Sequence, residues 1–335
     1  MTALLVADDL ARSFPIRRGL GNLLRGAPPP VVRALNGVSL SIARGETLAV
    51  VGESGCGKST LARTLVRLLD LDSGQIVFDG ADVRSLSGDA LRRYNRRVQM
   101  VFQDPYGSLN PRMQIGEILA EALRVHRLLP PADIPARITE LLALVGLPAA
   151  AAALLPHQFS GGQRQRIAIA RALSVTPELL IADEIVSALD VSIQAQILNL
   201  LLDLQQRLGL SILFVSHDLR VVRHLAHRVA VMYLGRVVEM GPADALFAAP
   251  LHPYTQALLR AAPTMTPPAP GMPRGTGKPA LTGELPSPLA IPSGCPFHPR
   301  CPQAMPRCSV EVPRVHIAPD HHLAECHLLD QGPGN

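Results

Sequence analysis

The chain has 335 residues, 47% of them hydrophobic, and its formal net charge of +5 comes from arginine, because the lysines are Lys58 and Lys278. Acidic Asp8 and Asp9 stand where a secretion signal has positive charge, and no apolar run approaches the roughly 18 residues that cross a bilayer. We therefore expect no targeting peptide and no membrane span, and a core large enough for roughly two or three structural units.

Predicted strands and helices alternate along most of the chain. Residues 46–51 form a short apolar run before a glycine-rich turn, and apolar residues then recur at helical spacing over residues 61–69. Further strands are predicted at residues 75–80, 98–104, 179–184, 211–217 and 228–235. This alternation predicts an α/β fold with a mostly parallel sheet that is covered on both faces.

Three segments are expected to stand apart from this core. Residues 104–160 carry helical but no convincing strand patterns, which predicts a helical insertion within a domain that spans residues 1–262. Residues 263–294 are rich in proline and glycine and predict an extended tether. Residues 295–335 form a small cysteine-containing extension.

The segment GESGCGKST matches the phosphate-binding loop pattern between a predicted strand and a predicted helix. Such a loop points backbone N–H groups at phosphate oxygens, and the helix dipole adds to the attraction. Lys58 is expected to reach the β- and γ-phosphates, and the Ser59 hydroxyl to ligate Mg²⁺. Cys56 is interpreted as a small filler. The predicted nucleotide-binding residues are Gly52, Glu53, Ser54, Gly55, Cys56, Gly57, Lys58, Ser59 and Thr60.

The apolar segment ELLIADE predicts a buried strand that ends in two carboxylates. Carboxylates at such a position are costly to bury unless a cation approaches them. Asp183 is expected to hold Mg²⁺, directly or through water, and Glu184 to polarise the attacking water.

Five motifs in order resemble those of ATP-binding cassette (ABC) ATPases, over roughly residues 1–262. The phosphate loop is followed by Gln103 in VFQDP, the signature-like FSGGQRQR at residues 159–166, SALD at residues 187–190, and His217 in VSHDL. The resemblance implies a P-loop NTPase core of the RecA-like kind with ATP and Mg²⁺ as ligands. Ile185 departs from the proline or alanine common in relatives, which is not expected to abolish activity.

The resemblance also implies that two ATPase domains pack head to tail, so that each chain supplies half of two ATP sites. Ser160, Gly161, Gly162, Gln163 and Asp190 would then serve a nucleotide on the partner. Glu184, His217 and Gln103 are the implied catalytic residues, with His217 holding the γ-phosphate and Gln103 sensing it and the Mg²⁺. Phe14 is a candidate for stacking on adenine, or else an ordinary buried aromatic.

The segments MVFQDPYGSLNPRM, MYLGRVVEMGP and LHPYTQALL resemble the ATPase subunits of peptide and nickel importers. This implies a second ATPase subunit, identical or more often a paralogue, and two transmembrane permeases fed by an extracytoplasmic binding protein. The chain would lie on the cytoplasmic face of the inner membrane and bind no nucleic acid. The leading interpretation is peptide uptake. The alternatives are nickel or another small cargo, or a soluble ABC-type ATPase acting on DNA or ribosomes.

Cysteines gather near the C-terminus with the spacing C-x5-C-x6-C-x17-C, at Cys295, Cys301, Cys308 and Cys326. Structural disulfides are disfavoured in the cytosol, where this ATPase would work. Four thiolates suit a [4Fe–4S] cluster or tetrahedral zinc, although the closely spaced pairs usual for zinc are absent. The resembled subfamily carries iron–sulfur clusters in this extension, which favours a cluster over zinc. Free thiols are the remaining alternative.

Overall fold

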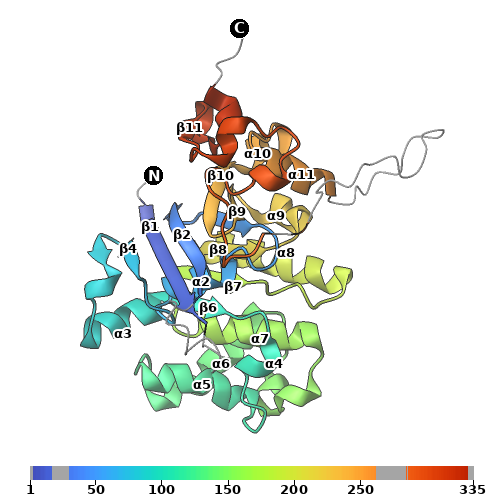
Figure 1. The fold of residues 1–335 in the computed structure, drawn as a ribbon. Coiled ribbons are helices and arrows are strands. Elements are labelled where there is room, and N and C mark those ends of the chain that lie inside the picture. Colours follow the sequence, from blue (N-terminus) through green and yellow to red (C-terminus); the bar gives the residue numbers. More distant parts are fainter. Residues whose placement is uncertain (1–2, 17–29, 262–283, 285, 331–335) are drawn as a thin grey trace, which may run out of the picture.

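The computed structural model describes residues 3–16, 30–261, 284 and 286–330. The predicted tether at residues 263–294 thus lies largely outside the described residues. Two sheets form the centre of the molecule, one of eight strands and one of four (Figure 1). In the described part of the chain, no helix is long and apolar enough to cross a membrane.

The large sheet has the order β11-β12-β10-β9-β3-β8-β7-β6. Its central strands β9, β3, β8, β7 and β6 run parallel, and β10, β12 and β11 continue the sheet in antiparallel pairs. This arrangement confirms the predicted α/β class with a mostly parallel sheet. The strands are β3 (Thr47–Val51), β6 (Val98–Val101), β7 (Leu179–Asp183), β8 (Ser211–Ser216), β9 (Arg228–Tyr233), β10 (Arg236–Pro242), β11 (Val315–Ile317) and β12 (Leu323–Glu325).

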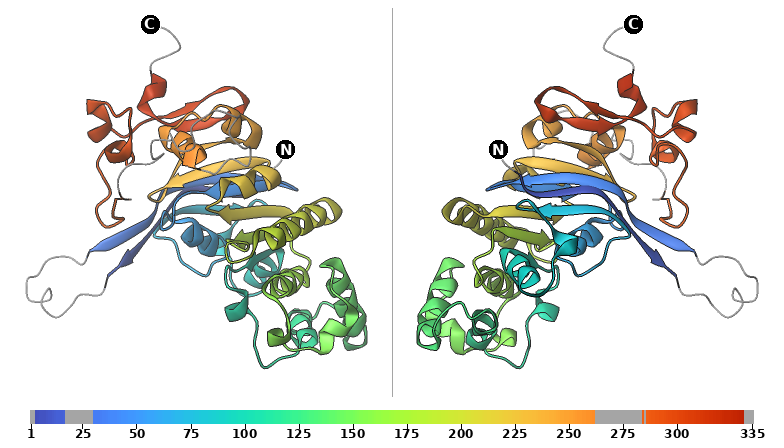
Figure 2. Two further views of the ribbon diagram at one scale, coloured as in Figure 1. Left: turned by 90° about the vertical axis from the view of Figure 1, so that its right-hand side faces the viewer. Right: turned by 90° about the vertical axis from the view of Figure 1, so that its left-hand side faces the viewer.

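The smaller sheet is antiparallel and has the order β2-β1-β4-β5. It comprises β1 (Ala3–Pro15), β2 (Val31–Ala43), β4 (Ser73–Phe78) and β5 (Ala81–Asp82). The strand predicted at residues 75–80 therefore belongs to this second sheet and not to the parallel one, because its N–H and C=O groups pair with β1. The β1–β2 hairpin projects from the body of the molecule (Figure 2).

Alternate residues of the central strands face two separate cores. On β3, Ala49 and Val51 belong to a core shared with the helices α5 to α11, whereas Leu48 and Val50 belong to a core shared with the smaller sheet. The helices α2 and α3 complete the second core. The sheet is thus covered on both faces, as the sequence predicts, but one cover is mainly another sheet.

Helices fill the connections between the strands. They are α2 (Lys58–Leu65), α3 (Gly88–Arg97), α4 (Pro105–Ser108), α5 (Ile115–Val125), α6 (Ile134–Leu144), α7 (Gly161–Leu173), α8 (Val191–Leu208), α9 (Leu219–Leu225), α10 (Ala243–Ala248) and α11 (Pro253–Ala261). Short 3₁₀ turns lie between α5 and α7 at Pro131–Asp133, Ala149–Ala153 and Pro156–Gln158. The helices α4 to α6 form a lobe below the sheets in Figure 1.

The cysteine-containing extension packs on the opposite end of the molecule from α5 and α6 (Figure 2). Its strand β12 pairs with β10, so that Ala324 lies opposite Glu239, and β11 pairs with β12. Phe297 is 1% exposed and belongs to the same core as the helices. The extension is therefore held by the main sheet and core, and not by its sulfur atoms alone.

Leu201 and Leu208, both on α8, test how much the core shared with the helices α5 to α11 contributes to the stability of the fold. Leu201 is fully buried and Leu208 is 50% exposed. Leu201→Ala should lower the free energy of unfolding by about 2–5 kcal/mol because it leaves a cavity. Leu208→Ala should cost less than about 1 kcal/mol. Denaturant unfolding of both variants measures the difference, and equal losses would contradict the assignment of α8 to this core.

Candidate functional site

The candidate site lies at the carboxyl ends of three adjacent parallel strands. The phosphate loop follows β3, Asp183 and Glu184 end and follow β7, and His217 follows β8. Since β3 pairs with β8 and β8 with β7, these groups meet at one edge of the sheet. Ligands of parallel α/β sheets bind in this location.

Lys58 is buried beneath the phosphate loop, with 4% of its surface exposed. Its ammonium group donates to the Gly52 carbonyl oxygen at 2.9 Å and to the Glu53 carbonyl oxygen at 3.0 Å. These bonds hold the loop in a curl around the lysine. The turn needs glycine, because a Cβ at Gly52 (φ 154°) would lie 2.2 Å from the Met232 carbonyl oxygen.

The rest of the loop divides into an exposed rim and a buried floor. Ser54 and Gly55 are exposed, whereas Ser59, Thr60 and Gly57 are half-buried at the start of α2. Cys56 is 1% exposed, and burial raises the pKa of its thiol, although the nearby Lys58 charge opposes the rise. Its burial agrees with the interpretation of Cys56 as a small filler.

The two predicted carboxylates lie beside the phosphate loop. The Ser59 hydroxyl donates to Asp183 Oδ1 at 2.9 Å, and burial raises the pKa of Asp183 while this hydrogen bond opposes the rise. A hydroxyl and a carboxylate oxygen in contact are ligands that suit Mg²⁺. The structure thus brings together Ser59 and Asp183, two of the three residues that the sequence assigns to Mg²⁺, and in the region that the structure describes no hydrogen bond joins the third, Gln103, to either of them.

Glu184 occupies the centre of the site. Its φ of 49° turns the chain directly after β7, and its N–H donates to the Val215 carbonyl oxygen at 3.0 Å. One carboxylate oxygen lies 3.7 Å from Lys58 Nζ and the other 3.6 Å from His217 Nδ1. Positive φ in a residue other than glycine is costly, and such strain clusters at functional sites.

Gln103 is linked to Glu184 through Ser187, the first residue of the SALD motif. The Gln103 side-chain N–H donates to Ser187 Oγ at 3.4 Å, and Ser187 Oγ donates to the Glu184 carbonyl oxygen at 2.9 Å. Gln103 and His217 are both exposed. Both catalytic candidates are therefore accessible to solvent, and His217 is the one that lies beside the Glu184 carboxylate.

The signature-like segment begins a different helix, α7. The Ser160 hydroxyl accepts from the Gln163 N–H at 3.3 Å, and Gln163 Oε1 accepts from the Ser160 N–H at 3.0 Å. This capping box fixes the helix start. Gly162 packs against α8, since a Cβ there would lie 2.4 Å from Ile193 Cγ2, and Asp190 is exposed at the N-terminus of α8.

The signature-like segment is not bonded to the phosphate loop of the same chain within the residues that the structure describes. In the part that the structure describes, no hydrogen bond or ion pair joins residues 160–163 to residues 52–60. Phe14 lies half-buried on β1, and the Arg12 guanidinium lies 4.9 Å from the centroid of its ring.

The four clustered cysteines form no disulfide and line one small cavity, together with His252, His298 and His327. The cavity measures about 10 Å³. Burial raises the pKa values of Cys295 and Cys326 to about 11. Among the described residues, no group of three or more His, Cys, Asp or Glu side chains is arranged to hold a metal ion. The iron–sulfur prediction stays a prediction.

Two contacts on the phosphate loop lie beyond the reach of sequence reasoning. Arg300 of the extension pairs with the Glu53 carboxylate, and the Tyr254 hydroxyl accepts from the Glu53 N–H. Glu53 and Arg300 are 247 positions apart, and no local pattern joins them.

Comparison with known proteins identifies two families. A family described as ABC transporter matches residues 35–187, and one described as oligopeptide/dipeptide transporter, C-terminal region, matches residues 238–308. A probable peptide ABC transporter ATP-binding protein of Sinorhizobium fredii is 52% identical over 97% of this chain and 90% of its own length. The di/tripeptide transport ATP-binding protein DppF of Pseudomonas aeruginosa is 50% identical over 99% of both.

Two solved structures are similar to this chain in fold. CbiO1 of Clostridium perfringens, part of the ABC transporter complex cbiONQ, superposes with a TM-score of 0.62 at 29% identity, over 74% of this chain and 91% of that one. The dimeric ATP-binding cassette MJ0796, in a post-hydrolysis state with ADP and Pi, gives a TM-score of 0.61 at 27% identity, over 71% and 98%.

Alanine substitutions at Gly52 and Gly45 distinguish the cost of a steric clash from the cost of backbone strain. Both have positive φ, but a Cβ at Gly45 would meet nothing within 4 Å. Gly52→Ala should lower the free energy of unfolding by the strain of about 1–3 kcal/mol plus about 1–3 kcal/mol for the clash with Met232. Gly45→Ala should show the strain alone. Thermal unfolding compares the two, and a Gly52→Ala variant no less stable than Gly45→Ala would exclude the close approach.

Proposed function

This chain belongs to the ABC transporter ATP-binding proteins that serve peptide import. We propose how its residues hydrolyse ATP and how hydrolysis is coupled to the membrane permeases. The chain is an ATPase subunit of a peptide importer, as its family and its relatives show. Those relatives favour peptide uptake over nickel or over an ATPase acting on DNA or ribosomes. The residue roles that follow are our proposal.

The proposal rests on one observation, the position of Glu184 between Lys58 and His217. Its carboxylate lies within 4 Å of both side chains, beside the loop that curls around the lysine. With ATP bound, Lys58 would turn from the loop carbonyls toward the β- and γ-phosphates. Glu184 would then accept a proton from the attacking water, while His217 holds the γ-phosphate.

Ser59 and Asp183 would hold Mg²⁺. Their side chains already present adjoining oxygen atoms, and the exposed amide oxygen of Gln103 would be the third ligand. The ion would neutralise charge on the phosphate oxygens when bound. Backbone N–H groups of residues 52–60 would bind the phosphates, and Phe14 would stack on adenine.

Each ATP site would be completed by a second ATPase subunit. The N-terminus of α7 is capped by Ser160 and Gln163, and its exposed start directs the positive end of the helix dipole outward. Because no hydrogen bond or ion pair of the described residues joins residues 160–163 to the chain's own phosphate loop, we propose that they and Asp190 serve the partner's nucleotide. We propose a paralogue as that partner, with a second copy of this chain as the alternative.

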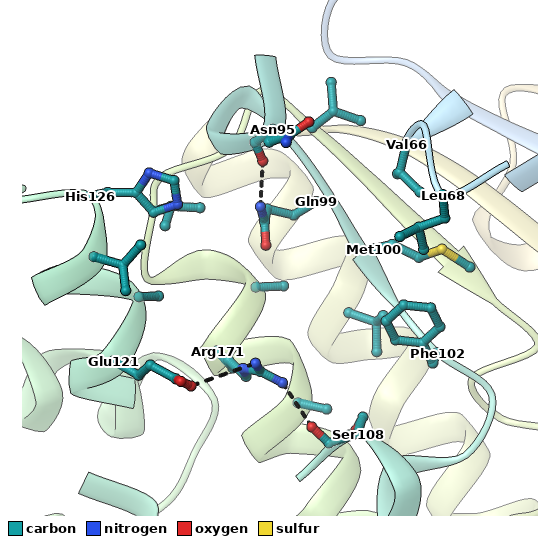
Figure 3. Close-up of a pocket in the computed structure, with 17 residues that line it drawn as sticks. Val66, Leu68, Asn95, Gln99, Met100, Phe102, Ser108, Glu121, His126 and Arg171 are labelled. Atoms are coloured by element: carbon teal, nitrogen blue, oxygen red, sulfur yellow. Dashed lines mark hydrogen bonds and ion pairs between the residues drawn. The ribbon is translucent and has the colours of Figure 1, made fainter. Parts of the chain in front are cut away.

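A groove beside Gln103 is the proposed contact with a permease. It measures about 420 Å³ and lies between β6, the end of α3, α5 and α7 (Figure 3). Leu68, Phe102 and Val125 line it and are 37–71% exposed, while Arg171 bonds to the Ser108 carbonyl oxygen at 2.7 Å. An apolar surface of this kind suits a cytoplasmic segment of a membrane protein.

Phe102 precedes Gln103, so a permease segment in this groove would be coupled to the ATP site. We propose that two permeases receive the motion, that a binding protein supplies the peptide outside, and that the chain is peripheral on the cytoplasmic face of the inner membrane. We also propose the domain division at residues 1–262, 263–294 and 295–335, with the helical subdomain at about residues 104–160.

We further propose that Cys295, Cys301, Cys308 and Cys326 ligate a [4Fe–4S] cluster. Their shared cavity supports this assignment, since four thiols are its donor set. A cavity of about 10 Å³ is barely large enough for one water molecule, so the side chains would have to move apart to admit a cluster. Zinc and free thiols are the alternatives.

Glu184→Gln tests the catalytic role. The amide cannot accept the proton, so turnover should fall by about 10²- to 10⁴-fold while ATP binding persists. Glu140→Gln, at an exposed position of α6, is the matched control and should keep wild-type ATPase activity. Phosphate release and nucleotide binding are measured on both variants. Full activity in Glu184→Gln would remove this residue from its role.

Anaerobic purification tests the cluster. The chain should be brown, absorb broadly near roughly 400 nm and contain about four iron and four sulfide per molecule. Cys301→Ser should lose the colour, whereas Cys56→Ser should keep it, because Cys56 lies outside the shared cavity. A colourless chain with one zinc would support the zinc alternative, and a metal-free chain would support free thiols.

A further inference from the structure

Glu53, the second residue of the phosphate loop, is held at each of its polar groups. Its N–H donates to the Tyr254 hydroxyl at 3.0 Å, and its carbonyl oxygen accepts from Lys58 at 3.0 Å. Its carboxylate accepts two hydrogen bonds from Arg300, at 2.6 Å and 3.0 Å. Two of the three partners thus lie far beyond the cassette motifs, on α11 and in the C-terminal extension.

The Arg300 contact is a bidentate ion pair between a buried arginine and a partly exposed carboxylate. The Arg300 side chain is 5% exposed and the Glu53 side chain 26%. Two parallel charge-assisted bonds fix direction as well as distance. Removing one partner of such a pair leaves a buried charge without its counter-ion, which is strongly unfavourable. The carboxylate is therefore confined to one position.

The extension in turn holds Arg300 rigidly. A tight turn between Cys295 and Cys301 carries it, with the Arg300 N–H donating to the Phe297 carbonyl oxygen at 3.0 Å. The Phe297 ring lies 5.3 Å from the rings of both Tyr254 and Tyr233. The two groups that grip Glu53 therefore belong to one packed cluster.

We propose that Arg300 is a positioning residue for ATP binding, through which the C-terminal extension fixes the backbone of the phosphate loop. The loop binds phosphate through N–H groups whose directions depend on its curl, and holding that curl before ATP arrives lowers the entropy cost of binding. This inference rests on the proposed function of the loop. By this inference, the extension helps to shape the ATP site through a residue that lies outside the cassette motifs.

The test compares variants of the full chain by the dissociation constant of a non-hydrolysable ATP analogue and by the KM and kcat for ATP. Arg300→Gln should raise the dissociation constant and KM about 5- to 10-fold, with kcat unchanged at saturation. Arg300→Lys should lie between this variant and the wild type, because it keeps the charge but not the fork. Glu53→Gln should raise the dissociation constant to a similar extent, and the double variant should bind the analogue no more weakly than either alone.

Arg236→Gln is the matched control. Arg236 on β10 pairs with Glu325 of the extension at 3.1 Å, so it also fastens the extension to the sheet without touching Glu53. This variant should lower the Tm and keep the wild-type affinity for the analogue. If Arg300→Gln does not fold, Arg300→Lys and Glu53→Gln decide the question.

Wild-type affinity in all folded variants at Arg300 and Glu53, with only a lowered Tm, would overturn the proposal. Additive losses in the double variant would also overturn it, since the residues would then act separately. A wild-type chain that bound no nucleotide would instead refute the proposed function of the loop.

Discussion

The burial of the Lys58 ammonium is the constraint on which the site depends. A buried cation must have acceptors around it, and here the carbonyl groups of Gly52 and Glu53 turn inward to supply them. The turn that this requires places Gly52 too close to β9 for any side chain. Glu184 adds a carboxylate oxygen 3.7 Å from the ammonium nitrogen, so the residue proposed as the catalytic base already lies beside the lysine.

The parallel sheet brings the remaining groups to that lysine. β8 lies beside β3, and β7 lies beside β8. The carboxyl ends of β7 and β8 place Asp183, Glu184 and His217 at the edge of the sheet where the phosphate loop begins. The two cores on the faces of the sheet hold these strands rigidly, since alternate residues of each strand pack into different cores. Preorganised groups of this kind need little rearrangement when charge develops in the reaction.

The C-terminal extension is continuous with this architecture. It adds two strands to the large sheet, and Glu239, fully buried on β10, accepts from the N–H groups of Leu251 and His252 and lies 2.7 Å from His322 Nε2. A fully buried carboxylate needs such partners to remain in the interior. Through Glu239, Glu53 and Glu325, the extension contacts the cassette at three carboxylates, one of which belongs to the phosphate loop.

The sequence determined the chemistry of this protein, because motifs such as GESGCGKST and LLIADE are local and their spacing alone predicts strand, turn and carboxylate pair. It also determined the parallel strands, whose apolar runs are continuous. Tertiary structure decided the rest. Strand 73–78 joined a second sheet because it pairs with β1, a strand far away in the sequence, and no local pattern predicts that pairing. Arg300 met Glu53 only because the chain returns over 247 positions, and no sequence period records such a contact.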